Sequence, residues 1–139
     1  MGYAYLGQTY LKQMAGNKTF DSVFDTKEKK LAFFQNLIIV AVADRHLDKQ
    51  ESDFLLDIGD QLGLSEEETR PITENLPSLT FVVPEEGLQK STELQALVMM
   101  MVQDGRIEER EYNLCLEYTR RIGFGKGILD DFIDQWRKQ

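Results

Sequence analysis

Residues 37–63 of the chain read LIIVAVADRHLDKQESDFLLDIGDQLG, and residues 97–123 read LVMMMVQDGRIEEREYNLCLEYTRRIG. A shift of 60 residues places Leu97 on Leu37, Asp104 on Asp44 and Gly123 on Gly63. Both stretches have the pattern of an apolar helix, an acidic turn, an amphipathic helix and a closing glycine. One constant offset over the whole stretch indicates an internal duplication, with copies at about 31–64 and 91–124.

Helical periodicity continues outside the two repeated stretches. Apolar residues recur three and four positions apart between residues 3 and 14, and again between residues 128 and 136. A helix pair cannot bury its apolar face alone, so two pairs are expected to pack against each other. We therefore predict an all-α fold, a single helical bundle over residues 1–139 with a duplicated helix–loop–helix core. Its buried residues should include Phe54, Ile58, Leu62, Leu114, Tyr118, Ile122 and Trp136.

Helix boundaries can be predicted from short local signals. An acidic or hydroxyl residue followed three positions later by Glu is typical of a capping box, a mutual hydrogen-bond pair at a helix start. This spacing occurs at 25–28, 48–51, 65–68 and 108–111. Pro84 is predicted as the first residue of the helix that carries Leu88 and Leu94 and ends near Gln103. Residues 77–83 have no partner strand and are predicted as an extended connector.

Composition limits the functions open to the chain. The net charge of −8 disfavours nucleic acid, because binding a phosphate backbone needs clustered cations. Residues 37–43 form the longest apolar run, far below the ~20 residues of a membrane helix, and the first residues lack the features of a signal peptide. These observations predict a cytoplasmic protein. Cys115 is the only cysteine and is expected to be buried.

The two acidic turns resemble a known family. Residues 43–51, ADRHLDKQE, residues 104–111, DGRIEERE, and the LGLS at 62–65 are similar to the TerB-like family, which includes the tellurite-resistance protein TerB and the N-terminal domain of the DjlA co-chaperone. The likeness covers roughly residues 31–133. It implies a helical bundle with a duplicated core, loop acids that bind a divalent cation, and a role in stress or membrane-associated complexes. The family favours a glycine after the turn aspartate. The second turn has this glycine, Gly105, whereas the first turn has Arg45 at the equivalent position.

Two interpretations of the turn acids stay open. Asp44 and Asp104 each end an apolar helix, where the helix dipole disfavours a negative charge. Their carboxylates could accept backbone N–H groups, with Glu51 and Glu111 serving as capping residues, and this arrangement is the commoner one. Alternatively, the turns lie side by side and pool these four carboxylates around calcium or magnesium. Additional candidate ligands are His46, Asp48 and Glu108.

No motif for catalysis is present in the sequence. It contains one histidine, and neither a nucleophile beside a base nor a glycine-rich phosphate loop is recognisable. We expect a non-enzymatic interaction module, with a stress-response role implied by the family resemblance. Its partners would be other proteins or further copies of the chain. The alternatives are a purely structural or oligomerisation domain without a ligand and, third, a metal-dependent hydrolytic site built from the same carboxylates.

Overall fold

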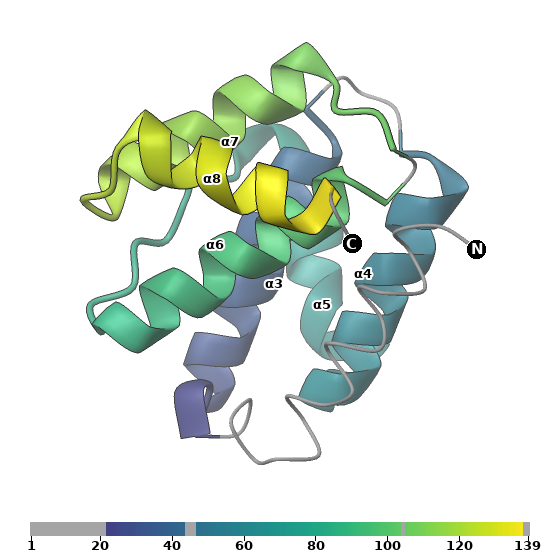
Figure 1. Cartoon of the computed structure of the whole chain (residues 1–139). Helices are drawn as coiled ribbons and strands as arrows, with labels where there is room; N and C mark the ends of the chain where they lie inside the picture. Colours follow the sequence, from purple (N-terminus) through teal and green to yellow (C-terminus); the bar gives the residue numbers. More distant parts are fainter. Residues whose placement is uncertain (1–21, 44–46, 104, 138–139) are drawn as a thin grey trace.

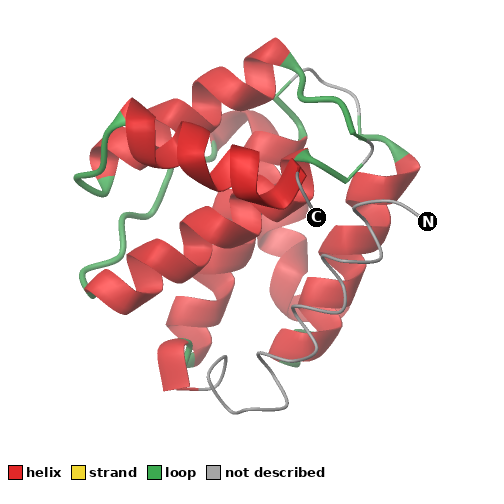
Figure 2. Cartoon of the chain, viewed as in Figure 1, coloured by secondary structure: helices red, strands yellow, loops and turns green. Residues whose placement is uncertain are grey.

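The computed structural model describes residues 22–43, 47–103 and 105–137. These residues fold into helices joined by loops, with no strand among them, so the all-α prediction is confirmed (Figure 2). The predicted helix at 3–14 lies outside the described residues. No helix in the described ranges is long and apolar enough to cross a membrane. In chain order the helices are α3 (Lys27–Ala41), α4 (Lys49–Leu62), α5 (Glu66–Thr73), the short 3-10 helix η1 (Leu76–Ser78), α6 (Gly87–Met101), α7 (Glu109–Arg121) and α8 (Lys126–Arg137).

Two of the predicted capping signals mark helix starts as expected, at α4 and α5. Asp48 begins α4 by accepting the backbone N–H of Glu51 at 2.8 Å. Ser65 and Glu68 form the complete capping box of α5. The prediction for α3 was displaced by one residue, because Thr26 rather than Asp25 is the cap and accepts the N–H of Lys29 at 3.1 Å. A threonine hydroxyl is one of the preferred N-cap groups, and Asp25 instead pairs with the Lys29 ammonium.

The segment between α5 and α6 differs from the prediction at both of its ends. The extended connector was predicted over residues 77–83, but Pro77 and Ser78 belong to η1, and the connector runs over residues 79–84, with Phe81 buried and Val82 and Val83 exposed. The start of α6 was predicted at Pro84 and is wrong, since the helix begins at Gly87 after a bend at 85–86. Pro84 is buried in the connector. The fixed backbone angle of proline suits extended chain as well as a first helical turn.

The helix bounds follow the spacing found in the sequence. α3 and α6 are both 15 residues long and begin 60 positions apart. α4 and α7 also begin 60 positions apart, as do α5 and α8. Gly63 and Gly123 follow the second helix of each pair with φ of 69° and 90°, in the left-handed region that glycine favours. These bounds are consistent with a duplication, which stays a prediction until residues 31–64 are superposed on 91–124.

The core lies between the two long apolar helices and the amphipathic helices around them. α3 contacts α4, α6 and α7, while α6 contacts α4, α7 and α8. The residues predicted to be buried are buried except Leu114, which is half-buried. Leu88, expected on the apolar face of α6, is 62% exposed. The inward positions in that part of the helix are taken instead by the polar residues Gln89 and Glu93.

α3 and α6 run side by side in the same direction. Near their starts, Lys29 Nζ of α3 lies 2.7 Å from Glu86 Oε1 at the cap of α6. Seven residues further along both helices, Asn36 Nδ2 lies 2.9 Å from Glu93 Oε1. Two contacts that are seven residues, or about 10.5 Å, apart along each helix show that α3 and α6 run in the same direction. The C-terminal ends of both helices therefore reach the same end of the bundle (Figure 1).

We predict that Leu62→Ala lowers the free energy of unfolding by roughly 2–5 kcal/mol, because Leu62 is buried in the core and its truncation leaves a cavity. Urea denaturation would measure the change. Leu56→Ala is the matched control on the same helix, since Leu56 is 67% exposed, and it should change stability by less than about 0.5 kcal/mol. Equal effects of the two substitutions would contradict the packing described here.

Candidate functional site

The acidic turns form the first candidate site. Two of their predicted site residues are engaged in local contacts. The Asp48 carboxylate caps α4, and Glu108 Oε1 lies 3.5 Å from Arg106 Nη2 in an exposed ion pair. Glu108 is the residue before α7 but makes no side-chain capping bond. The capping interpretation therefore holds for the first turn at Asp48 and fails for Glu108 in the second.

Glu51 and Glu111 occupy equivalent places in the first turn of α4 and of α7. Both are buried, with 6% and 2% of their surface exposed. Burial of a carboxylate is costly unless hydrogen bonds or a positive charge compensate it. The sequence identified both residues as helix-start acids, but gave no indication that their side chains would be buried.

The remaining predicted ligands, Asp44, His46 and Asp104, lie outside the described residues. Within the described ranges, no group of three acidic, histidine or cysteine residues is arranged to hold a metal ion. Gly105 has φ of 80°, in the left-handed region that glycine adopts without strain. The described parts of both turns, residues 42–43 and 47–48 after α3 and residues 102–103 and 105–108 after α6, lie at one end of the bundle (Figure 1).

A second candidate site lies at the centre of the bundle and was not found from the sequence. Glu93 of α6 is fully buried. Its Oε1 accepts hydrogen bonds from Asn36 Nδ2 of α3 at 2.9 Å and from the Tyr118 hydroxyl of α7 at 3.0 Å. Its Oε2 accepts a bond from Gln89 Nε2 at 2.8 Å. One carboxyl group thus joins three helices.

Asn36 extends this network to the connector. Its amide nitrogen donates to the carbonyl oxygen of Val82 at 2.9 Å, and its amide oxygen accepts the Val82 N–H at 2.9 Å. Phe81 packs beside the same centre, with its ring centroid 5.3 Å from that of Tyr118. The connector has no strand partner, so Asn36 supplies the backbone hydrogen bonds that a strand would have provided.

Burial governs the proton affinity of this centre. Desolvation raises the pKa of Glu93, although the hydrogen bonds from Asn36, Gln89 and Tyr118 oppose the shift. Desolvation, followed by the Glu93 charge, raises the pKa of Tyr118. Burial also raises the pKa of Cys115 to about 12, so this thiol stays protonated at neutral pH. The prediction of a buried cysteine is confirmed.

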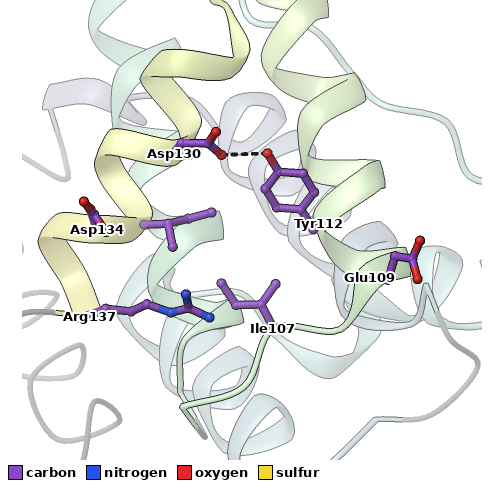
Figure 3. A pocket seen from close by; sticks show the side chains of 7 residues that line it. Ile107, Glu109, Tyr112, Asp130, Asp134 and Arg137 are labelled. Carbon is purple, nitrogen blue, oxygen red and sulfur yellow. Dashed lines mark hydrogen bonds between the residues drawn. The ribbon is translucent and has the colours of Figure 1, made fainter.

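A cavity of about 380 Å³ lies between the second turn, α7 and α8 (Figure 3). Asp130 receives a hydrogen bond from the Tyr112 hydroxyl at 2.6 Å and an ion pair from Lys126 at 2.6 Å. Ile107 and Arg137 lie on the far side of this opening from Asp130. The Asp130 carboxylate is thus already held by two donors, and its pKa is lowered, chiefly by Lys126.

The described part of the chain is a small helical bundle with acidic interhelix turns. Residues 10–73 match the family model of the tellurite resistance protein TerB, which confirms the resemblance to the TerB-like family. The match begins earlier than the resemblance suggested and covers the first helix pair, ending before the second. No curated protein and no solved structure matches the chain.

We predict that Glu93 makes the chain less stable as pH rises above 4.5, the ordinary pKa of a glutamate. Because its folded-state pKa is raised, the folded chain binds more protons than the unfolded chain between the two pKa values. The free energy of unfolding therefore falls as pH increases through this window. Urea denaturation of wild type and Glu93→Gln at pH 5 and pH 8 would measure the effect.

The comparison between the two proteins isolates Glu93 from the other titrating groups. Gln89 can rotate its amide to accept from a glutamine at position 93, so the hydrogen bonds survive the substitution. Wild type should lose stability relative to Glu93→Gln between pH 5 and pH 8. A constant difference between the two proteins, or one of opposite sign, would contradict the role of burial.

Proposed function

We propose that the chain is a non-enzymatic interaction module of the TerB type that acts in the cytoplasm, in a stress response such as tellurite resistance. The family match over residues 10–73 supports the type of domain, and the name of the matched family is the reason for proposing tellurite as the stress. We further propose that the module binds a divalent cation at the end of the bundle where its two acidic turns lie. The partner-binding surface would then respond to the cation.

The parallel course of α3 and α6 is the observation that carries the cation proposal. It brings the turns after both helices to one end, and each turn contributes an aspartate at an equivalent sequence position, Asp44 and Asp104. The negative ends of two helix dipoles add to the potential of these acids. Carboxylate oxygens are the donors that calcium and magnesium prefer, and Glu51 and Glu111 begin the next helices beside the turns.

A purely structural domain is the competing function. Asp48 supports it, because this acid is fully explained as a helix cap. In that case the turns would terminate helices, and the chain would act only by packing against a partner. The two functions differ in one measurable property, since a cation that binds only the folded state must stabilise it.

We predict that the melting temperature rises with millimolar calcium or magnesium and that Asp44→Asn combined with Asp104→Asn removes the response. A cation at a hundredfold excess over its dissociation constant would add about 2.7 kcal/mol to the free energy of unfolding. Calorimetry of the full chain, first with chelator and then with either cation, measures the shift.

The matched control replaces the same number of charges away from the turns, with Asp57→Asn combined with Asp131→Asn. This variant should keep the cation response, because Asp57 lies within α4 and Asp131 within α8. Equal melting temperatures of the wild-type chain in chelator and in excess cation would leave the structural domain as the function. If the variant that combines Asp44→Asn with Asp104→Asn still melted at a higher temperature in cation, the cation would bind at another site.

A further inference from the structure

The outer faces of α4 and α7 each carry a leucine, and the two leucines are at equivalent positions. The α4 leucine has acidic neighbours, whereas the α7 leucine has a basic one. On α4, Leu56 is 67% exposed and lies on one stripe with Asp53 and Asp60, three residues before it and four after it. On α7, Leu116 lies on a stripe with Asn113 and Arg120 at the same spacings.

The α7 face is hollowed and partly basic. A groove of about 540 Å³ is lined by Asn113, Leu116, Glu117, Arg120 and Arg121. The Arg121 guanidinium is held in place, 3.0 Å from Glu117 and 6.0 Å from the centroid of the Phe81 ring. Arg120 is exposed and forms no ion pair with any residue in the described ranges. Its charge is therefore available to a partner beside the half-buried Leu116.

The α4 face is the acidic counterpart. Asp53 is paired with Lys49 at 2.9 Å, whereas Asp60 is exposed and makes no ion pair within the part of the chain that the structure describes. Leu56 projects an apolar side chain between these acids. The two faces belong to helices that lie apart in the bundle, α4 at the right and α7 at the top of Figure 1. One molecule can therefore present both faces at once.

We propose that the chain associates head to tail with further copies of itself, Leu56 of one copy entering the α7 groove of the next and Asp60 pairing with Arg120. Charge complementarity identifies a second copy as the occupant, because the required apolar side chain and acid stand together on α4. Contacts between two different faces build rings or open filaments rather than a symmetric dimer. The net charge of −8 opposes association at long range, so weak association is expected.

Sedimentation velocity of the full chain from micromolar to millimolar concentration tests the proposal. The buffer contains chelator, so that the result does not depend on the proposed cation. Its ionic strength is near 0.1 M, which screens charges that are more than about 10 Å apart. The average mass of wild type should rise with concentration. Asp60→Arg and Arg120→Glu should each weaken association by about tenfold or more. In either variant the side chains at positions 60 and 120, which would pair between copies, carry charges of the same sign.

An equimolar mixture of these two variants should recover the association, since every face of one then meets an opposite face of the other. Asp60→Arg is the more discriminating variant, because it lowers the net negative charge and would strengthen association if long-range repulsion alone controlled it. Asp131→Arg, which makes the same charge change on α8, should not weaken association. Leu56→Ser should weaken it, whereas Leu88→Ser, at a leucine of α6 that is 62% exposed, should not.

Circular dichroism confirms folding of each variant before the comparison. A wild type that stays monomeric at every concentration would overturn the proposal and leave the α7 groove to another protein. Variants that associate like wild type, or a mixture that stays monomeric, would overturn it as well.

Discussion

The hydrogen bonds to the buried carboxyl group of Glu93 are the interaction on which the arrangement of the helices depends. Removing a carboxyl group from water is costly, and the cost falls only if its oxygens receive donors. Asn36, Gln89 and Tyr118 supply three donors, and they come from α3, α6 and α7. These donors can converge on Glu93 only when the three helices take the observed positions. Apolar packing alone tolerates more than one alignment of two helices, whereas this network does not.

The parallel alignment of α3 and α6 is the main consequence of this interaction. Asn36 meets Glu93 in the same register in which Lys29 meets Glu86. The same asparagine holds the connector through both polar groups of Val82, so the chain returns to the start of α6 along a fixed path. The turns after the two helices then share one end of the bundle, and the amphipathic helices α4 and α7 are left to present their outer faces on different sides. Both proposals rest on this geometry.

Local rules account for the parts of the fold that could be predicted from the sequence. Ser65, Asp48 and Gly63 mark helix ends through contacts within one turn, and the structure follows each of them. The spacing of apolar residues likewise located the core at Phe54 and Tyr118. The error at Pro84 arises because proline suits both an extended segment and a helix start.

The central network could not be predicted, because its members are far apart in the sequence. Glu93 closes the polar run QKSTE at residues 89–93 of α6, and charged residues in such a run usually face solvent. Gln89, Glu93 and Met100 lie on one inward stripe of α6, and only the packing of α3 and α7 shows that the stripe is buried. The turn acids were predicted as a group, but their role as ligands depends on a geometry that capping rules do not determine.

A double-mutant cycle on Asn36 and Glu93 tests the central claim most directly. Urea denaturation of wild type, Asn36→Ala, Glu93→Ala and the double variant gives the coupling free energy between the two side chains. Residues that act through one network should be coupled by about 1–3 kcal/mol, so the double variant should be less destabilised than the sum of the single variants. Effects that add within about 0.5 kcal/mol would show that the two residues contribute independently, and that Glu93 does not fix α3 against α6.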